Sequence, residues 1–455
     1  MDEFNKLYEV LNPAQKHAVD CIDGPVMVIA GPGTGKTTIL TLRIANILKE
    51  TDTAPDSILA LTFTESGAYA MRRKLVEIIG PAAYKVNIQT FHGFAESIIQ
   101  KYPDYFPRII GSKIITDAEQ IKITEKLIDS KLIKILRPYG DPTYYVRPVL
   151  SEIQILKREN VSPSEFKKSI ERDLADLNDV GSGQGKNMEL RIRNFEIRDK
   201  KIVVSGKDLK RDKILKSSGK DKALSMAEIE KLKKRNEKNL ELAYLYGKYE
   251  KQLAEDRFYD FDDMLLELIR AMEENYLFKL MLQETYQYIL ADEHQDANAS
   301  QNRILELLAD FDESPNLFIV GDDKQAIYRF QGASLDNFLF FSRKYKQAKV
   351  IDLEHNYRSH QGILDASHSL IANNPGIEGR ERTRLISLQI GSKPIFIDEL
   401  PAANDELEYV ATIIERLLKK GEKPEEIAIL YRENKEADRI AAALKVHGVP
   451  YRIES

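Results

Sequence analysis

Residues 30–37, Ala-Gly-Pro-Gly-Thr-Gly-Lys-Thr, have the types and spacing needed to hold a phosphate group. An apolar run at 25–29 precedes this loop and a helical pattern at 38–50 follows it, which is the strand–loop–helix context of a phosphate-binding loop. Glycines allow a tight turn that points successive N–H groups into one anion-sized hollow, and the helix start adds partial positive charge. Lys36 is expected to reach the outer phosphates, and the Thr37 hydroxyl to ligate Mg²⁺. A flexible glycine loop that binds nothing is the less favoured alternative in this context.

Two acidic residues, Asp292 and Glu293, follow another apolar run at 288–291. Paired with a phosphate loop, carboxylates at a strand end suit a nucleotide site that holds Mg²⁺. Asp292 is expected to hold the metal through its water shell, and Glu293 to polarise the attacking water. An acid pair alone would carry little weight, so this prediction depends on the phosphate loop.

A polar residue and two aromatic residues follow the apolar run at 317–320. Gln325 could sense the γ-phosphate, and Tyr328 and Phe330 could form a platform on which bases stack. Ordinary loop packing is the alternative for all three residues.

Gln15 and His92 also have both a functional and a structural interpretation. Gln15 lies just after Asn12-Pro13, which is typical of a helix cap with proline in the first turn, and its amide offers a donor and an acceptor to an adenine edge. His92 follows the apolar run at 86–90, where the carboxyl ends of parallel strands bind ligands in α/β sheets. It could equally be a core histidine with satisfied hydrogen bonds.

Alternating strand and helix patterns place these candidate residues on one parallel sheet. The expected strands lie at 25–29, 57–62, 86–90, 288–291, 317–320 and 349–353, with helices at 38–50 and in the stretch that ends at 79. Because the carboxyl ends of parallel strands meet at one edge of a sheet, we expect the candidate side chains to gather there.

Between residues 101 and 255 the alternation lapses, which predicts an inserted and mainly helical domain. Within it, 191–206 predicts a hairpin and 227–255 one long helix. The lysine-rich stretch 207–220 is interpreted as a solvated loop in preference to a phosphate-backbone contact. A second α/β layer is expected after residue 356, with strands at 394–397, 427–430 and from 450, and helices at 406–420 and 435–447.

The composition is that of a globular protein with a sizeable core. Of its 455 residues, 43% are hydrophobic and 31% charged, and 67 Lys and Arg against 72 Asp and Glu give a net charge of −5. This balance neither requires nor excludes a nucleic-acid partner, because a basic groove can lie within an acidic protein. The single cysteine, Cys21, excludes an intrachain disulfide. With no signal-peptide pattern and no apolar run of membrane length, we expect a cytoplasmic protein that has no membrane partner.

Eight motifs occur in one order and together resemble those of the UvrD/Rep/PcrA helicases of superfamily 1. They lie at 11–15, 30–37, 62–64, 89–92, 260–263, 292–296, 321–333 and 356–359, and residues 427–453 resemble the family's second motor domain. The inserted block at 101–255 carries no such motif. The resemblance implies an α/β fold: a RecA-like P-loop NTPase parallel sheet with a mostly helical inserted domain and an incomplete second RecA-like domain.

The resemblance also implies an ATP-driven motor that moves 3′ to 5′ on single-stranded DNA and acts in repair, replication or recombination. The expected catalytic residues are Glu293 as general base, Lys36, Gln325 and Arg358. The expected nucleotide-binding residues are Gln15, Ala30, Gly31, Pro32, Gly33, Thr34, Gly35, Lys36, Thr37, Thr38, Tyr357, which would stack on adenine, and Arg358. The expected ligands of Mg²⁺ are Thr37 and Asp292, and the expected DNA contacts are Phe63, His92, Tyr328 and Phe330.

The sequence departs from the family pattern at several positions. Ala30 stands in the first glycine position of the loop, and Thr38 replaces a common arginine. Glu65-Ser66-Gly67-Ala68 replaces Asn-Lys-Ala-Ala, which removes a positive charge near the predicted DNA path, and Gln331 replaces an arginine. Asp323-Lys324-Gln325 is more similar to the RecB/AddA helicase–nuclease subunits. The family's later motifs are absent, so we expect an N-terminal fragment of low activity.

Three functions follow from these observations. The first is the motor portion of a DNA helicase, the second is the motor of a helicase–nuclease, and the third is a non-hydrolysing nucleic-acid-binding or regulatory protein. The intact set Lys36, Thr37, Asp292 and Glu293 argues against the third for the parent protein, but not for this fragment alone. The expected partners are single-stranded DNA and single/double-strand junctions, bound by a monomer.

The expected domains are a discontinuous motor domain at 1–100 and 256–355, the insertion at 101–255 and a second motor domain at 356–455.

Overall fold

A computed structural model gives the fold and describes residues 2–181, 195–198, 201–204, 226–322, 324–325, 341, 343–373, 383–392 and 394–453. The chain divides into two compact units, residues 1–391 and 392–455. The domain boundaries expected from the sequence remain predictions.

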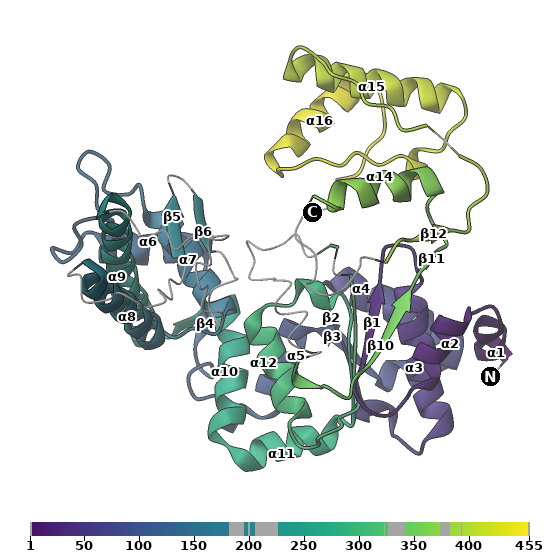
Figure 1. Ribbon diagram of the computed structural model, residues 1–455, viewed down its shortest axis with the longest axis horizontal. Coiled ribbons are helices and arrows are strands. Elements are labelled where there is room, and N and C mark those ends of the chain that lie inside the picture. Colours follow the sequence, from purple (N-terminus) through teal and green to yellow (C-terminus); the bar gives the residue numbers. More distant parts are fainter. Residues whose placement is uncertain are drawn as a thin grey trace. The chain divides into compact units, whose positions relative to one another are not determined.

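A six-stranded parallel sheet forms the centre of the first unit (Figure 1). Its strands are β1 (Val26–Ala30), β2 (Ile58–Thr62), β3 (Asn87–Thr90), β8 (Tyr288–Ala291), β9 (Leu317–Gly321) and β10 (Lys349–Leu353), in the order β10-β1-β9-β8-β2-β3. β1, β2, β8 and β9 are buried along their whole length, as expected for apolar strands covered on both faces. All six predicted strands are therefore confirmed.

Helices cover both faces of this sheet, and the alternation of side chains in β1 supplies both cores. Val26, Val28 and Ala30 belong to one apolar cluster, whereas Met27 and Ile29 belong to the other. The first cluster packs under α1 (Asp2–Glu9), α2 (Pro13–Asp20), α3 (Lys36–Glu50) and α4 (Glu65–Ile79). The second packs under α5 (Phe91–Lys101), α10 (Phe261–Glu274), α11 (Tyr276–Thr285) and α12 (Ala299–Ala309).

The inserted segment is mainly helical, as predicted, and has a core of its own. Its helices are α6 (Asp117–Ile128), α7 (Val146–Arg158), α8 (Pro163–Gly181) and α9 (Met226–Glu255), packed around residues such as Phe166 and Tyr249. The predicted hairpin is confirmed as β5 (Phe195–Arg198) antiparallel to β6 (Lys201–Val204). The segment's two ends meet where β4 (Lys113–Ile114) pairs with β7 (Phe258–Tyr259). The lysine-rich stretch 207–220 lies outside the described residues.

Short elements complete the two units. Beyond β10 the first unit has β11 (His355–Asn356), which pairs with β12 (Ile386–Ser387), and α14 (Gln361–Ile371). In the second unit, α15 (Ala403–Lys419) and α16 (Lys435–Val446) pack through an apolar cluster that includes Ala411, Ile414 and Leu444. Single 3-10 turns lie at Pro55–Ser57, Gly80–Lys85, Pro103–Tyr105, His294–Asp296 and Pro424–Glu426.

The strands expected at 394–397, 427–430 and from 450 were wrong. Between residues 394 and 453 the described backbone forms no strand at these places. Their apolar side chains are largely exposed, with Ile397 at 92% and Leu430 at 95%. A strand needs a neighbouring backbone to hydrogen-bond, and an apolar pattern alone does not supply one.

In the described part of the chain, no helix combines the length and the apolar character needed to cross a membrane.

Candidate active site

The glycine loop joins β1 to α3, as predicted. Gly33 and Gly35 have φ of +71° and +90°, left-handed values that side chains disfavour. At Gly33 an added Cβ atom would also lie 2.7 Å from Cβ of Arg358. Both the backbone angle and the lack of space therefore require glycine at this position. The Thr34 hydroxyl closes the turn by donating to the Gly31 carbonyl over 2.8 Å. The loop leads directly into the start of α3 at Lys36, where the partial positive charge of a helix N-terminus favours an anion.

A cavity of about 360 Å³ lies over this loop. It is lined by Pro32, Gly33, Gly35, Lys36, Thr37, Thr38, Lys74, Glu293, Gln325 and Arg358. All of these except Lys74 belong to the residue set expected from the sequence. They come together because β1, β8, β9 and β10 end at the same edge of the parallel sheet.

An ion pair between Lys36 and Glu293 joins the two strongest motifs, with Nζ and Oε2 2.7 Å apart. Glu293 holds a left-handed φ of +47°, which for a side chain other than glycine costs on the order of 1–3 kcal/mol. Gln295 donates to the same Oε2 over 2.6 Å, and the Glu293 N–H donates to Asp292 Oδ1 over 2.9 Å. Donors from Lys36 and Gln295 hold the carboxylate of Glu293 in place despite the strained backbone. The carboxylate therefore lies beside the Lys36 ammonium group, which is expected to contact phosphate.

Asp292 and Thr37 have the chemistry of a magnesium ligand set. Burial and the charge of Glu293 raise the pKa of Asp292 to about 6, so the carboxylate is mostly ionised at pH 7. Its backbone N–H donates to the carbonyl of Leu61, which ties the end of β8 to β2. A hydroxyl and a carboxylate oxygen fit Mg²⁺, a cation that prefers oxygen ligands and keeps several waters.

Gln325 is connected to Glu293 through a chain of hydrogen bonds. Its side-chain NH₂ donates to Asp322 Oδ2 over 2.9 Å, and the Asp322 N–H donates to Gln295 Oε1 over 2.9 Å. Gln295 in turn donates to Glu293. Gln325 on the cavity wall is therefore linked to the carboxylate of Glu293 through Asp322 and Gln295.

The segment 356–359 is tied to the glycine loop by hydrogen bonds that the sequence did not reveal. The buried amide of Asn356 donates to the Pro32 carbonyl and accepts from the N–H groups of Arg358 and Ser359 over 2.9 and 2.7 Å. The Tyr357 N–H donates to the Gly33 carbonyl over 2.9 Å. These bonds place Arg358 on the cavity wall. In the sequence, only the residue type of Asn356 indicated this role, because asparagine side chains commonly hydrogen-bond to the backbone two residues later in the chain.

Gln15 lies between the glycine loop and Tyr357. Its NH₂ group donates to the Thr34 carbonyl over 2.9 Å, while its Oε1 accepts from the Asn12 N–H over 3.1 Å and from the Tyr357 hydroxyl over 3.3 Å. The predicted helix cap at Asn12 is confirmed as a reciprocal pair with Gln15. Gln15 is buried in the structure, and its assignment to adenine stays a prediction.

Lys74 adds a second ammonium group to the cavity. It lies on α4 and donates to the Thr38 hydroxyl over 2.5 Å, and burial lowers its pKa. The run Arg72-Arg73-Lys74 is typical of the solvent-facing charges of a helix, so nothing in the sequence marked Lys74 as a site residue. The Lys74 ammonium group thus contacts Thr38, the residue that stands where the family commonly has an arginine.

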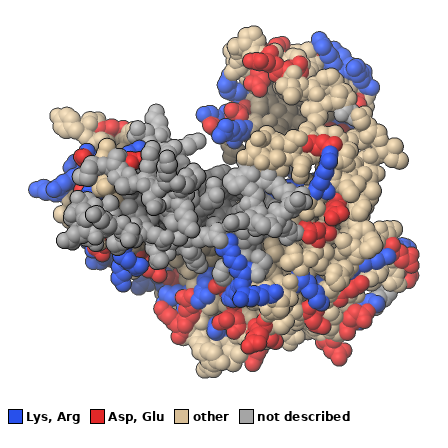
Figure 2. Space-filling view, viewed as in Figure 1, with Lys and Arg blue, Asp and Glu red and all other residues tan. Residues whose placement is uncertain are grey.

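The predicted DNA contacts are described in part. Phe63 directly follows β2 and is 37% exposed, and His92 lies in the first turn of α5, which follows β3 at the same edge. Burial and the charge of Arg158 lower the pKa of His92 to about 4, so the imidazole is neutral at pH 7. Tyr328, Phe330 and Gln331 lie outside the described residues. On the face that Figure 2 displays, the described basic and acidic side chains are interspersed.

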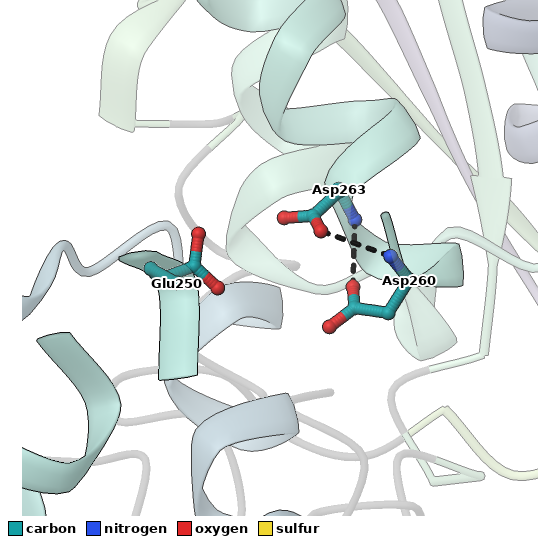
Figure 3. A group of neighbouring side chains, drawn as sticks. All are labelled: Glu250, Asp260 and Asp263. Carbon is teal, nitrogen blue, oxygen red and sulfur yellow. Dashed lines mark hydrogen bonds between the residues drawn. The ribbon is translucent and has the colours of Figure 1, made fainter. Parts of the chain in front are cut away.

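A buried ion cluster lies where the inserted segment meets α10. Glu250, Asp260 and Asp263 offer oxygens within 4.8 Å of one another, a grouping that could hold a metal ion (Figure 3). The fully buried ammonium of Lys157 takes this place instead, 2.7, 2.6 and 2.8 Å from the three carboxylates. Arg108 pairs with Glu250 from a second side, over 2.6 Å. The cluster is therefore a structural salt-bridge network that joins α7, α9 and α10.

The fold and the cavity define a P-loop nucleotide-binding protein. The family model described as "UvrD/REP helicase N-terminal domain" matches residues 11–346, and the one described as "UvrD-like helicase C-terminal domain" matches residues 351–455. The chain belongs to the UvrD/REP helicase family. The second match does not confirm the expectation of an N-terminal fragment, and neither match supports the RecB/AddA-like features of 323–325, of which Asp323 lies outside the described residues.

Curated relatives agree with this family. The chain is 30% identical over 453 residues to the ATP-dependent DNA helicase PcrA of Bacillus subtilis (strain 168), covering 99% of this chain and 51% of that protein. It is 29% identical over 447 residues to PcrA of Staphylococcus epidermidis (strain ATCC 12228 / FDA PCI 1200), at 98% and 51% coverage. It is also 29% identical over 447 residues to the ATP-dependent DNA helicase Rep of Buchnera aphidicola subsp. Acyrthosiphon pisum (strain APS), at 97% and 57%. The chain thus spans about half the length of the curated relatives it matches.

Proposed function

We propose that this chain is the motor portion of an ATP-dependent DNA helicase, which hydrolyses ATP and moves 3′ to 5′ on single-stranded DNA. The observation that carries the proposal is the convergence of Lys36, Glu293, Gln325 and Arg358 on one cavity over a glycine loop. The names of the relatives, ATP-dependent DNA helicases PcrA and Rep, support the same activity. Binding of single/double-strand junctions and action as a monomer are part of the proposal.

The proposed roles follow from charge and position. Lys36 and Arg358 bring positive charge to the phosphates, and Lys74 adds a third cation on the same wall. Glu293 orients the attacking water and accepts its proton, at a position fixed by Gln295. Thr37 and Asp292 would hold Mg²⁺, which neutralises charge on the phosphate oxygens when it is bound. Phe63 and His92 are proposed to face the DNA, where aromatic side chains grip bases of any sequence.

The first test is nucleotide binding by Lys36→Ala, measured by calorimetry with Mg·ATP. Loss of a charge-assisted hydrogen bond costs about 1.5–3 kcal/mol, so we expect affinity to fall by roughly 10- to 150-fold. Lys49→Ala is the matched control, because Lys49 lies on the same helix but pairs with exposed Glu50. Equal affinity in the unsubstituted chain and Lys36→Ala would show that the cavity is not the nucleotide site.

A further inference from the structure

A loop at residues 129–139 of the inserted segment presents large apolar side chains to solvent, and the function proposed above gives it no role. It directly follows α6. Its exposed apolar residues are Leu132 at 66%, Ile135 at 40% and Tyr139 at 108%. Between them, Ile133 and Leu136 are buried in the core of the inserted segment. Two apolar side chains therefore anchor the 129–139 loop while three others face solvent.

The first half of the 129–139 loop is a turn with an apolar residue at its corner. The Ile133 N–H donates to the Ser130 carbonyl over 3.1 Å, which closes a four-residue turn around Lys131 and Leu132. Turn positions are usually occupied by Gly, Pro, Asn, Asp or Ser. An exposed leucine at this corner departs from that rule, and local departures are expected at functional positions.

The second half of the 129–139 loop is held by one carboxylate. Glu241 of α9 accepts hydrogen bonds from three successive N–H groups, those of residues 134–136, over 2.8 to 3.0 Å. Successive N–H groups aimed at one anion form a nest, and here a side chain of the same protein fills it. Arg137 also pairs with Asp129 across the loop. Because these contacts fix the shape of the loop, little conformational entropy would be lost when a partner binds.

The charges of the 129–139 loop favour an acidic partner. Asp129 is already paired within the loop, and Asp141 just beyond it accepts hydrogen bonds from the N–H and hydroxyl of Thr143. Lys131 and Lys134 are exposed, and neither has an ion pair among the residues that the structure describes. Two ammonium groups available to a partner therefore alternate with the exposed apolar side chains.

A protein segment fits this surface better than a nucleic acid or a membrane does. Basic and polar side chains hold nucleic-acid backbones and aromatic rings hold bases, so neither contact would use Leu132 or Ile135. Membrane surfaces are commonly bound by amphipathic helices, whereas this surface is a loop. Interfaces between proteins have an apolar core and a polar rim, which is the pattern found here.

We propose that the 129–139 loop is a docking site for an acidic segment of a partner protein, one that carries apolar side chains of its own. The three exposed apolar residues form the centre of this interface, and the two lysines pair with carboxylates at its rim. The loop shares no residue with the nucleotide cavity, so the inference goes beyond the proposed function and does not depend on it.

The test uses two synthetic helical peptides that differ only in charge. One carries leucine and phenylalanine on one face and glutamate on the other, and the second has lysine in place of each glutamate. Titration with the 455-residue chain, followed by fluorescence anisotropy, should show salt-sensitive binding of the acidic peptide and little binding of the basic one. Leu132→Ser combined with Ile135→Ser should weaken binding of the acidic peptide by at least about tenfold, because it removes the apolar centre.

Charge reversal gives the sharpest comparison. Lys131→Glu combined with Lys134→Glu should lose the acidic peptide and gain the basic one, an exchange that unfolding of the loop would not produce. Leu277→Ser is the matched control, because Leu277 is 75% exposed but lies on α11, outside the inserted segment. All of these variants should bind Mg·ATP as the unsubstituted chain does, which shows that they are folded.

Several results would overturn the inference and leave the proposed function standing. They are absence of binding of the acidic peptide, equal binding of the two peptides, undiminished binding by the Leu132→Ser, Ile135→Ser variant, and failure of the charge-reversed variant to bind the basic peptide. Duplex DNA and phosphatidylserine vesicles are titrated in parallel. Binding of either one that is tighter than binding of the acidic peptide, and is lost on charge reversal, would overturn the assignment to a protein partner.

Discussion

Glu293→Gln is expected to lower the rate of ATP hydrolysis by about 10²- to 10⁴-fold, the usual contribution of a positioned general base. Glutamine has the same shape, and its carbonyl can still accept the hydrogen bond from Gln295, but it cannot take a proton from water. Nucleotide affinity should stay the same or rise, because the carboxylate that now pairs with Lys36 at 2.7 Å is removed. Rate and affinity are thus expected to change independently.

The measurement is single-turnover hydrolysis of labelled ATP with protein in excess, with and without single-stranded DNA, beside calorimetric binding. Single-turnover conditions detect slow hydrolysis, which suits a chain that spans about half of its relatives' length. Glu50→Gln serves as the control, since Glu50 pairs with Lys49 at the far end of α3. Hydrolysis by Glu293→Gln within a few-fold of the unsubstituted rate would exclude the general-base role. A parallel loss of binding would assign Glu293 a structural role instead.

Much of the first unit was predictable from the sequence because its signals are local. Each strand of the sheet is a short apolar run, and the topology of parallel strands then gathers their carboxyl ends. The glycine loop is contiguous, so its residues needed no tertiary information. The strands of the second unit failed because a strand also depends on a partner backbone, which the residues at 394–397 and 427–430 do not themselves encode.

The remaining parts of the site depend on contacts between residues far apart in the chain. Asn356 bonds the loop at Pro32 from 324 positions away, and Lys74 reaches Thr38 across 36 positions. In a sequence, Lys74 cannot be distinguished from the arginines beside it, since only the packing of α4 against α3 turns it toward the cavity. His92 was correctly placed at the sheet edge, but the ring that covers it comes from residue 261.

The Lys157 cluster is the clearest case of a feature that the sequence does not reveal, because a lysine with no distinguishing motif on α7 is the centre of a buried network of charges. Burial alone would lower the pKa of Lys157, but the charges of Asp260, Asp263 and Glu250 raise it well above its ordinary value. Replacing Lys157 by methionine keeps most of the side-chain volume and removes the charge. Three carboxylates would then lie within 4.8 Å without their central cation.

We expect Lys157→Met to lower the free energy of unfolding by about 3–5 kcal/mol, the cost of leaving buried charge unpaired. Chemical denaturation measures this loss, and Lys251→Met, which removes an exposed i,i+4 pair with Glu255, should cost at most about 1 kcal/mol. Adding Asp263→Asn to Lys157→Met should restore part of the stability, since it removes one of the repelling charges. A loss below 1 kcal/mol would mean that α7, α9 and α10 are joined by apolar packing and not by this ion cluster.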